Sequence, residues 1–195
     1  MAAIKHTKNE LKAQRDALTR FERFLPMLQL KKQQLQAELQ AIQAVIDQKA
    51  EVEKQKREQI MSWARLFSEP VGLEDMMGLP SVQTEEGNIA GVRIPILQKV
   101  DIERGSIDLF ETPSWVDDAM DAIEDLVRLK VEREILEEQY RLIAEELRTT
   151  SQRVNLFEKV KIPECREHIR IIKIFLGDEQ TAAVVRGKIA KKRGA

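Results

Sequence analysis

Cysteine, aromatic residues and long apolar runs are all scarce in this sequence of 195 residues. The only cysteine, Cys165, cannot form a disulfide within the chain, which fits a reducing compartment. No run of 18 apolar residues occurs, and residues 1–25 carry a Lys or Arg every few positions without an apolar core. These absences argue against a membrane-spanning or secreted protein. Aromatic residues make up only 5% of the chain, which is too few for a wide globular core.

Glycine and proline are also few, and most of the eight Gly and six Pro lie between residues 70 and 113. The rest of the chain is rich in helix formers, because Ala, Glu, Lys, Leu and Arg account for 91 residues. One third of all residues are charged. This composition is typical of long helices and coiled coils rather than of a compact mixed fold.

A heptad pattern runs from Ile4 to Phe67 without a break. Of the 19 a and d positions in this stretch, 13 are apolar, which predicts one long coiled-coil helix. The seam becomes polar at Lys49, Glu53 and Lys56, so we expect a different partner surface there.

The region of residues 70–113 has another character, because Gly and Pro interrupt any helix and short segments rich in β-forming residues lie between them. Those segments are 81–84, 89–97 and 100–102, and Glu86-Gly87-Asn88 is typical of a hairpin turn between strands. We predict a small head that contains short β-strands. The seam does not need this head, so we expect the helices to stay folded without it.

A second long helix is predicted from Ser114, a favourable N-cap residue that is followed by aspartates in the first turns. Its seam slips by one residue between Phe157 and Ile162, next to Pro163. The sequence therefore predicts a mainly α fold: a long antiparallel coiled coil of an N-terminal and a C-terminal helix, with a small β-hairpin-containing head in the middle. The segments are a helix over 1–69, the head over 70–113, and a helix with a basic tail over 114–195. At a common rise per residue, Ile4 pairs with about Ala190.

No pattern for catalysis or metal binding is present. His6 and His168 have no ligand-type residues at a suitable spacing, and Gly187-Lys188 lacks the rest of a phosphate loop. Cys165 falls on the seam, where a small buried hydrophobic residue is more common than a nucleophile. We expect no enzyme activity of the chain's own, no cofactor and no metal.

The charge is divided along the chain, although the net charge is only −1. Residues 1–33 and 149–195 together carry a net charge of +11, and residues 34–148 carry −12. If the chain folds back on itself, both termini lie at a basic end. Solvated helix faces alone can produce clusters of charge. A basic tail could also suit nucleic acid, but no aromatic residues are interleaved with it.

Two segments resemble a known family. The run from Arg153 to Glu158, followed by Ile162-Pro163, resembles the R-V-N-A-L-E…I-P signature of the D subunit of V/A-type (vacuolar/archaeal-type) rotary ATPases. The segment from Asn88 to Pro95 resembles the N-I-M-G-V-x-x-P segment of the same family. Thr7-Lys8…Leu11 and Leu28…Lys31-Lys32…Leu35 are also similar to the N-terminal helix of that family. The resemblance therefore spans nearly the whole chain in the same order and points to a bacterial branch of the family. Its signature residues here are Arg153, Val154, Asn155, Glu158, Ile162 and Pro163.

The resemblance implies a non-catalytic central rotor-stalk subunit that transmits torque in an ATP-driven or ATP-synthesising ion pump. Its partners would be the A and B subunits of the hexamer, the F subunit and the subunit that connects to the membrane rotor. The chain would be cytoplasmic and peripheral to the membrane, with no direct insertion and no nucleic acid. The hexamer-facing tip would comprise Lys5, Lys8, Arg186, Lys188, Lys191, Lys192 and Arg193.

Three other classes remain open at this stage: a prefoldin-like co-chaperone, a coiled-coil adaptor and a nucleic-acid-binding coiled coil. A co-chaperone would need exposed apolar helix ends, whereas these termini are basic. Nucleic-acid binding through the tail would depend steeply on salt.

Overall fold

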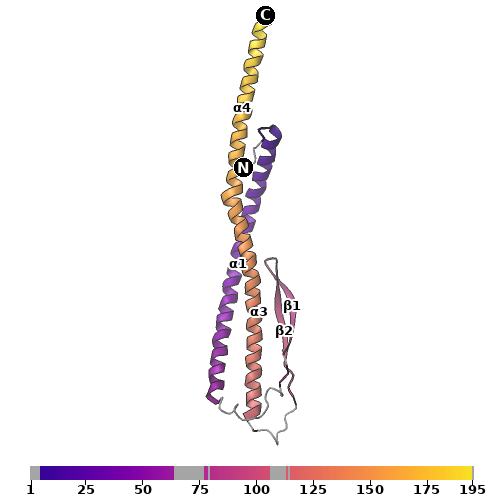
Figure 1. The fold of residues 1–195 in the computed structure, drawn as a ribbon, viewed down its shortest axis with the longest axis vertical. Helices are drawn as coiled ribbons and strands as arrows, with labels where there is room; N and C mark the ends of the chain where they lie inside the picture. Colours follow the sequence, from indigo (N-terminus) through magenta and orange to yellow (C-terminus); the bar gives the residue numbers. More distant parts are fainter. Residues whose placement is uncertain (1–4, 64–76, 79, 106–112, 114, 195) are drawn as a thin grey trace. The chain divides into compact units, whose positions relative to one another are not determined.

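The computed structural model describes residues 5–63, 77–78, 80–105, 113 and 115–194. Within these ranges it contains long helices and one antiparallel β-hairpin, which confirms the predicted fold class. Figure 1 shows the hairpin beside the helix that follows it. The elements are α1 (Lys8–Trp63), β1 (Ser81–Ile89), β2 (Val92–Asp101), α3 (Trp115–Leu156), the π-helical turn η2 (Phe157–Lys161) and α4 (Ile162–Arg193).

The chain divides into two compact units, and each unit takes one part of α1. Unit 1 comprises Met1–Gln33 and Arg148–Ala195, and unit 2 comprises Gln34–Leu147. The division coincides with the division of charge. Unit 1 has 20 Lys and Arg against 8 Asp and Glu, whereas unit 2 has 12 against 25. The net charges are therefore +12 and −13.

In unit 1, the N-terminal part of α1 pairs antiparallel with the end of α3, with η2 and with α4. Phe21 packs on Phe157 with a ring-centroid distance of 4.9 Å, and Glu22 forms an ion pair with Arg166 at 2.8 Å. The fully or largely buried side chains on the C-terminal side are Thr150, Val154, Ile162, Cys165 and Ile172. On α1, every predicted seam position from Leu11 to Ile60 is at least half-buried, which confirms the predicted heptad register.

Unit 2 contains a core built from both helices and the hairpin. Leu35, Leu39 and Ile42 of α1 and Ile143 of α3 enclose Ile94 of β2, which is only 4% exposed. The side-chain amide of Gln139 also donates a hydrogen bond to the carbonyl of Pro95 at 2.5 Å. The hairpin thus packs into the core of unit 2, and the expectation that the helices stay folded without the head stays a prediction. The sequence pattern did not reveal this packing because Ile94 is the single buried residue of β2.

Ion pairs fill the polar part of the seam in unit 2. Lys49 pairs with Glu132 at 2.5 Å, Glu53 pairs with Arg133 at 3.3 Å, and Lys56 pairs with Asp125. The side chain of Glu53 is only 13% exposed, so this pair is largely removed from water. The predicted change of partner surface at Lys49, Glu53 and Lys56 is therefore confirmed: α3 offers charges of opposite sign instead of apolar side chains.

The hairpin turn lies three residues beyond its predicted place. The turn residues are Ala90 and Gly91, with φ of 50° and 83°, and the amide of Gly91 donates to Asn88 Oδ1 at 2.9 Å. Positive φ at both central residues is typical of a two-residue type I′ hairpin turn. Gly87 instead lies within β1, opposite Ile94. A Cβ at this position would come within 2.3 Å of the Ile96 side chain, so the glycine makes room for packing rather than for a turn.

The predicted segment boundaries at 69/70 and 113/114 stay predictions, because residues 64–76, 106–112 and 114 lie outside the described part of the chain. The proposed N-cap, Ser114, is among them. The described helix α3 begins at Trp115, with aspartates at 117 and 118 in its first turn.

Candidate functional site

The signature residues gather around the π-helical turn η2 in unit 1. Val154 and Ile162 are 5% and 7% exposed and belong to the buried seam. The other four, Arg153, Asn155, Glu158 and Pro163, are exposed on the same short stretch of helix. The signature therefore combines two core positions with an exposed polar surface beside them.

The turn η2 confirms the one-residue slip expected from the sequence. The amide of Ile162 donates to the carbonyl of Phe157, which is an i→i−5 hydrogen bond and accommodates one extra residue. Pro163 follows in the first turn of α4, where its missing N–H and its ring are best tolerated. Buried seam residues on both sides of η2 show that the seam is maintained across the slip.

The C-terminal part of α4 has no helix packed on it among the described residues. Every residue from Gly177 to Gly194 is exposed, and Figure 1 shows α4 continuing past the N-terminal end of α1. The predicted pairing of Ile4 with about Ala190 is wrong. Ile4 lies outside the described residues, but His6 stacks on Phe175 with a ring-centroid distance of 4.7 Å. Beyond Leu176 the seam positions of α4 offer no large apolar side chain, so α1 has nothing further to pack against.

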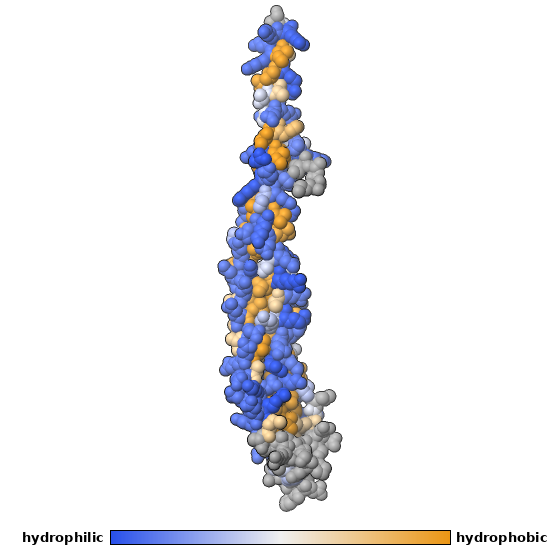
Figure 2. All heavy atoms as spheres, turned by 60° about the vertical axis from the view of Figure 1, so that its left-hand side comes forward, coloured by the Kyte–Doolittle hydropathy of each residue, from blue (hydrophilic) through white to orange (hydrophobic). Residues whose placement is uncertain are grey.

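A second apolar stripe runs along this uncovered segment. Ile174, Val185 and Ile189 are each about half exposed, at 52%, 48% and 49%, and Val184 beside them is 57% exposed. Polar Asp178 and Thr181 lie on the same face between Ile174 and Val185. With 3.6 residues per turn, Ile174 and Val185 lie roughly opposite the seam that faces α1, and Ile189 lies about a quarter of a turn from that seam. The stripe is therefore a separate face and not a continuation of the intramolecular seam. Figure 2 shows apolar atoms on the C-terminal part of α4 with hydrophilic atoms around them.

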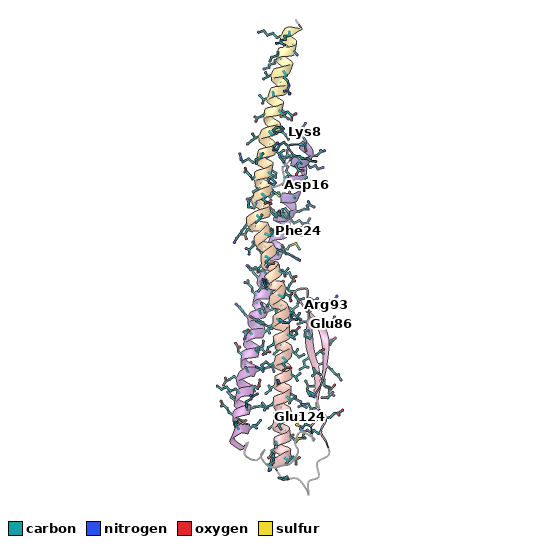
Figure 3. The ribbon with its side chains drawn as sticks, in the orientation of Figure 1. Lys8, Asp16, Phe24, Glu86, Arg93 and Glu124 are labelled. Atoms are coloured by element: carbon teal, nitrogen blue, oxygen red, sulfur yellow. The ribbon has the colours of Figure 1, made fainter. Side chains whose placement is uncertain are left out.

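Basic side chains surround the end of this stripe. The helix ends with Lys191, Lys192 and Arg193 in its last turn, and Arg186 and Lys188 precede them. All five are exposed, as are Lys5 and Lys8 near the N-terminus. Figure 3 shows Lys8 on α1 beside α4. The C-terminal residues thus combine an apolar stripe with a dense positive charge, whereas Lys5 and Lys8 lie near the level of Phe175.

The pKa values of Cys165 and Glu167 in unit 1 are shifted by their surroundings. Burial raises the pKa of the Cys165 thiol, and nearby Glu164 raises it further. A raised pKa lowers the thiolate fraction, which is the opposite of what a nucleophilic cysteine needs. A hydrogen bond from Arg170 lowers the pKa of Glu167, and both side chains are solvent-exposed.

In unit 2 the strongest polar cluster holds the base of the hairpin. Arg104 donates to Glu124 at 2.8 Å through Nε and to Asp121 at 2.6 Å through Nη2. These hydrogen bonds raise the pKa of Arg104. Arg128 also pairs with Glu124, whose side chain is 10% exposed. The cluster joins the segment after β2 to α3, near Glu124 in Figure 3, and it was not expected from the sequence. An arginine 20 residues from its acidic partner carries no periodic signal.

Among the described residues, no group of three or more His, Cys, Asp or Glu side chains could hold a metal ion. No helix in the described ranges has the length and apolar character needed to cross a membrane.

Comparisons with known proteins identify the family. Residues 10–192 match the family of the ATP synthase D subunit. The chain belongs to this family. It is 47% identical over 191 residues to the V-type ATP synthase D subunit of Borreliella burgdorferi, covering 98% of this chain and 95% of that protein. The V-type ATP synthase D subunits of Chlamydia pneumoniae and Chlamydia muridarum are 38% and 36% identical over 97% of this chain and 92% and 95% of their own.

These matches confirm the predicted bacterial D-subunit family and the predicted stalk subunit of a rotary ATPase. None of them supports the co-chaperone alternative. The basic residues named from the sequence all belong to unit 1, and their hexamer-facing role stays a prediction; the sequence reasoning missed the apolar residues beside them. The signal was present as Ile174, Val185 and Ile189, at spacings that a helix brings to one face.

Proposed function

We propose that this chain is the non-catalytic central shaft of a V-type rotary ATPase and transmits torque between the catalytic hexamer and the membrane rotor. Its partners are the A and B subunits, the F subunit and the subunit that connects to the membrane rotor. The chain works in the cytoplasm, at the membrane periphery, as part of that complex. It contributes no catalytic group, and ATP is handled by its partners.

The observation that carries this proposal is the uncovered end of α4. Half-exposed Ile174, Val185 and Ile189 lie on a face that the chain itself does not cover, and five basic residues surround the stripe's end. Apolar side chains on an uncovered helix gain free energy when another chain buries them. We assign the surface to the interior of the A/B hexamer.

This surface extends the purely electrostatic tip expected from the sequence. Charge attraction is screened and only weakly directional, so it can hold a turning shaft without fixing its angle. A narrow apolar stripe adds contact on one side only, which makes the tip asymmetric. An asymmetric shaft can press differently on three catalytic sites in turn, as a rotor must.

The test is assembly of the full chain with the A/B hexamer at low and high salt. The charge variant changes Lys188, Lys191, Lys192 and Arg193 to Glu, and the stripe variant changes Val185 and Ile189 to Ser. We expect the charge variant to assemble more weakly at low salt, with the difference shrinking as salt rises. We expect the stripe variant to assemble more weakly at both salt concentrations, because apolar contact is not screened.

A matched control applies the same change of charge to unit 2. It changes four exposed basic residues there, Lys54, Arg57, Lys99 and Lys130, to Glu. This control should assemble with the hexamer as the native chain does. Unchanged assembly of both tip variants would contradict the proposed hexamer-facing surface.

A further inference from the structure

The turn η2 lies where the heptad register of the C-terminal helix shifts relative to that of α1. On α1 the seam runs through unit 1 in one heptad register. The opposing helical segment, from α3 through η2 to α4, has two registers. The register before η2 ends at Phe157, and the register after η2 begins at Ile162. A continuous heptad would place this second start one residue earlier. Without a local insertion, the second register would point about 100° away from α1. The π-helical turn takes up this residue within five positions.

The place of the insertion is fixed from both sides by polar residues. If the turn moved toward the C-terminus, the earlier register would continue and place Lys161, Glu164 and His168 in the seam. If it moved toward the N-terminus, the later register would place Glu158, Asn155 and Ser151 there. Burying any of these groups without partners costs free energy. The turn is therefore held between Phe157 and Ile162 by the cost of either displacement.

The helical hydrogen-bond pattern is interrupted at this point. Pro163 has no N–H, so one carbonyl in the preceding turn lacks its helical donor. Ile162 already donates to the carbonyl of Phe157 instead of to the one four residues back. The side chains at Glu158, Lys159 and Val160 are exposed, so water reaches the widened turn.

We propose that η2 is a hinge of defined position, at which α4 twists relative to the end of α3 while both keep their seams on α1. The buried residues on either side, Val154 and Ile162, hold the seam, and the wide turn between them absorbs the rotation. In the rotor assigned above, this hinge gives the hexamer-facing end of α4 an elastic connection to the rest of unit 1. That mechanical role rests on the proposed function, but the hinge itself does not.

The first experiment measures amide hydrogen exchange in the full-length native chain. We expect amides of residues 158–164 to exchange at least about tenfold faster than those of 147–154 and 168–173, because local opening is easiest where hydrogen bonds are missing. Equal protection across these three segments would overturn the proposal.

A second variant removes the insertion. Deleting Lys159 together with Pro163→Ala leaves Ile162, Cys165 and Ile172 on the seam and restores a continuous heptad. We expect the fast-exchanging segment to disappear in this variant. The single variant Pro163→Ala keeps the extra residue, so we expect its amides at 158–164 to exchange as fast as in the native chain. If these amides were instead as protected as those of the flanking helices, the proline would be the cause of fast exchange. That result would overturn the role of the register slip.

The motor provides an independent measurement. In an assembled, surface-fixed ATPase with a bead on the shaft, the deletion variant should show a narrower angular spread during catalytic pauses than the native chain. An unchanged spread, with exchange results as expected, would overturn the elastic role. Failure of the native chain to assemble with the hexamer would instead contradict the proposed function and leave the exchange results standing.

Discussion

The two units solve the same packing problem with different chemistry. In unit 1 the seam between the helices is packed mainly with apolar side chains, and the π-helical turn accommodates the one-residue shift of register. Unit 2 closes part of its seam with ion pairs and adds a β-strand residue, Ile94, to its core. An apolar seam tolerates local rearrangement because its contacts are not directional, whereas paired charges fix which residues face each other.

The largest expected effects come from the two cores. Leu35→Ala in unit 2 and Ile172→Ala in unit 1 each remove a side chain that is 0% exposed, and each should lower the free energy of unfolding by about 2–5 kcal/mol. Urea unfolding followed by circular dichroism measures the loss. The control Ile189→Ala, on the exposed stripe, should change it by less than about 0.5 kcal/mol. Equal losses for all three variants would show that the stripe is covered in the free chain.

In the ion-paired part of the seam, a single substitution should lower the free energy of unfolding more than a double substitution that removes both partners. Glu53→Leu leaves Arg133 with only the more distant Glu137, at 3.8 Å, and should cost about 1–2 kcal/mol, since a partly buried charge loses its nearer partner. Adding Arg133→Leu should recover most of the loss. The control Glu134→Leu removes a 58% exposed carboxylate and should change the unfolding free energy by less than about 0.5 kcal/mol. A double variant as unstable as Glu53→Leu would contradict the pairing.

Glycine substitutions compare the uncovered end of α4 with the hairpin. Nothing lies within 4 Å of a Cβ added at Gly177 or Gly187, so alanine should stabilise this part of the helix by about 1 kcal/mol at each position. Slower amide hydrogen exchange over residues 177–193 in the alanine variants than in the native chain would show this stabilisation. Gly87→Ala should instead destabilise unit 2, because its Cβ would approach the Ile96 side chain to 2.3 Å. If Gly87→Ala is neutral, the close packing at that position is not required.

The smallest expected effect is a pH dependence at Cys165. Its pKa in the folded chain is raised above the ordinary value of 9.0 by burial. At pH values below about 9 the thiol is neutral in both states, and above it the unfolded chain ionises first. The free energy of unfolding should therefore fall as pH rises past about 9. Cys165→Ala should remove this contribution to the pH dependence of the unfolding free energy. An identical pH dependence above about pH 9 in the variant and the native chain would contradict the prediction.

The periodicity and charge pattern of the sequence were enough to predict the long helices, the register slip and the basic termini. The unbroken heptad of α1, the one-residue slip before Ile162 and the basic termini could all be read from residue spacing, because a helix turns regular spacing into a face. The family signature could be read for the same reason, since its residues are contiguous. These features depend on neighbours in sequence, which the sequence displays directly.

Contacts between distant segments were decided only by the tertiary structure. The turn at Ala90-Gly91, the burial of Ile94 against Leu35 and Ile143, and the attachment of Arg104 to Glu124 depend on strand register and on residues far apart in the sequence. The pairing of His6 with Phe175, rather than with residues near the C-terminus, likewise depends on where the two seams interlock. A repeating heptad permits several registers that differ by whole turns, and only the full set of side-chain contacts selects one of them.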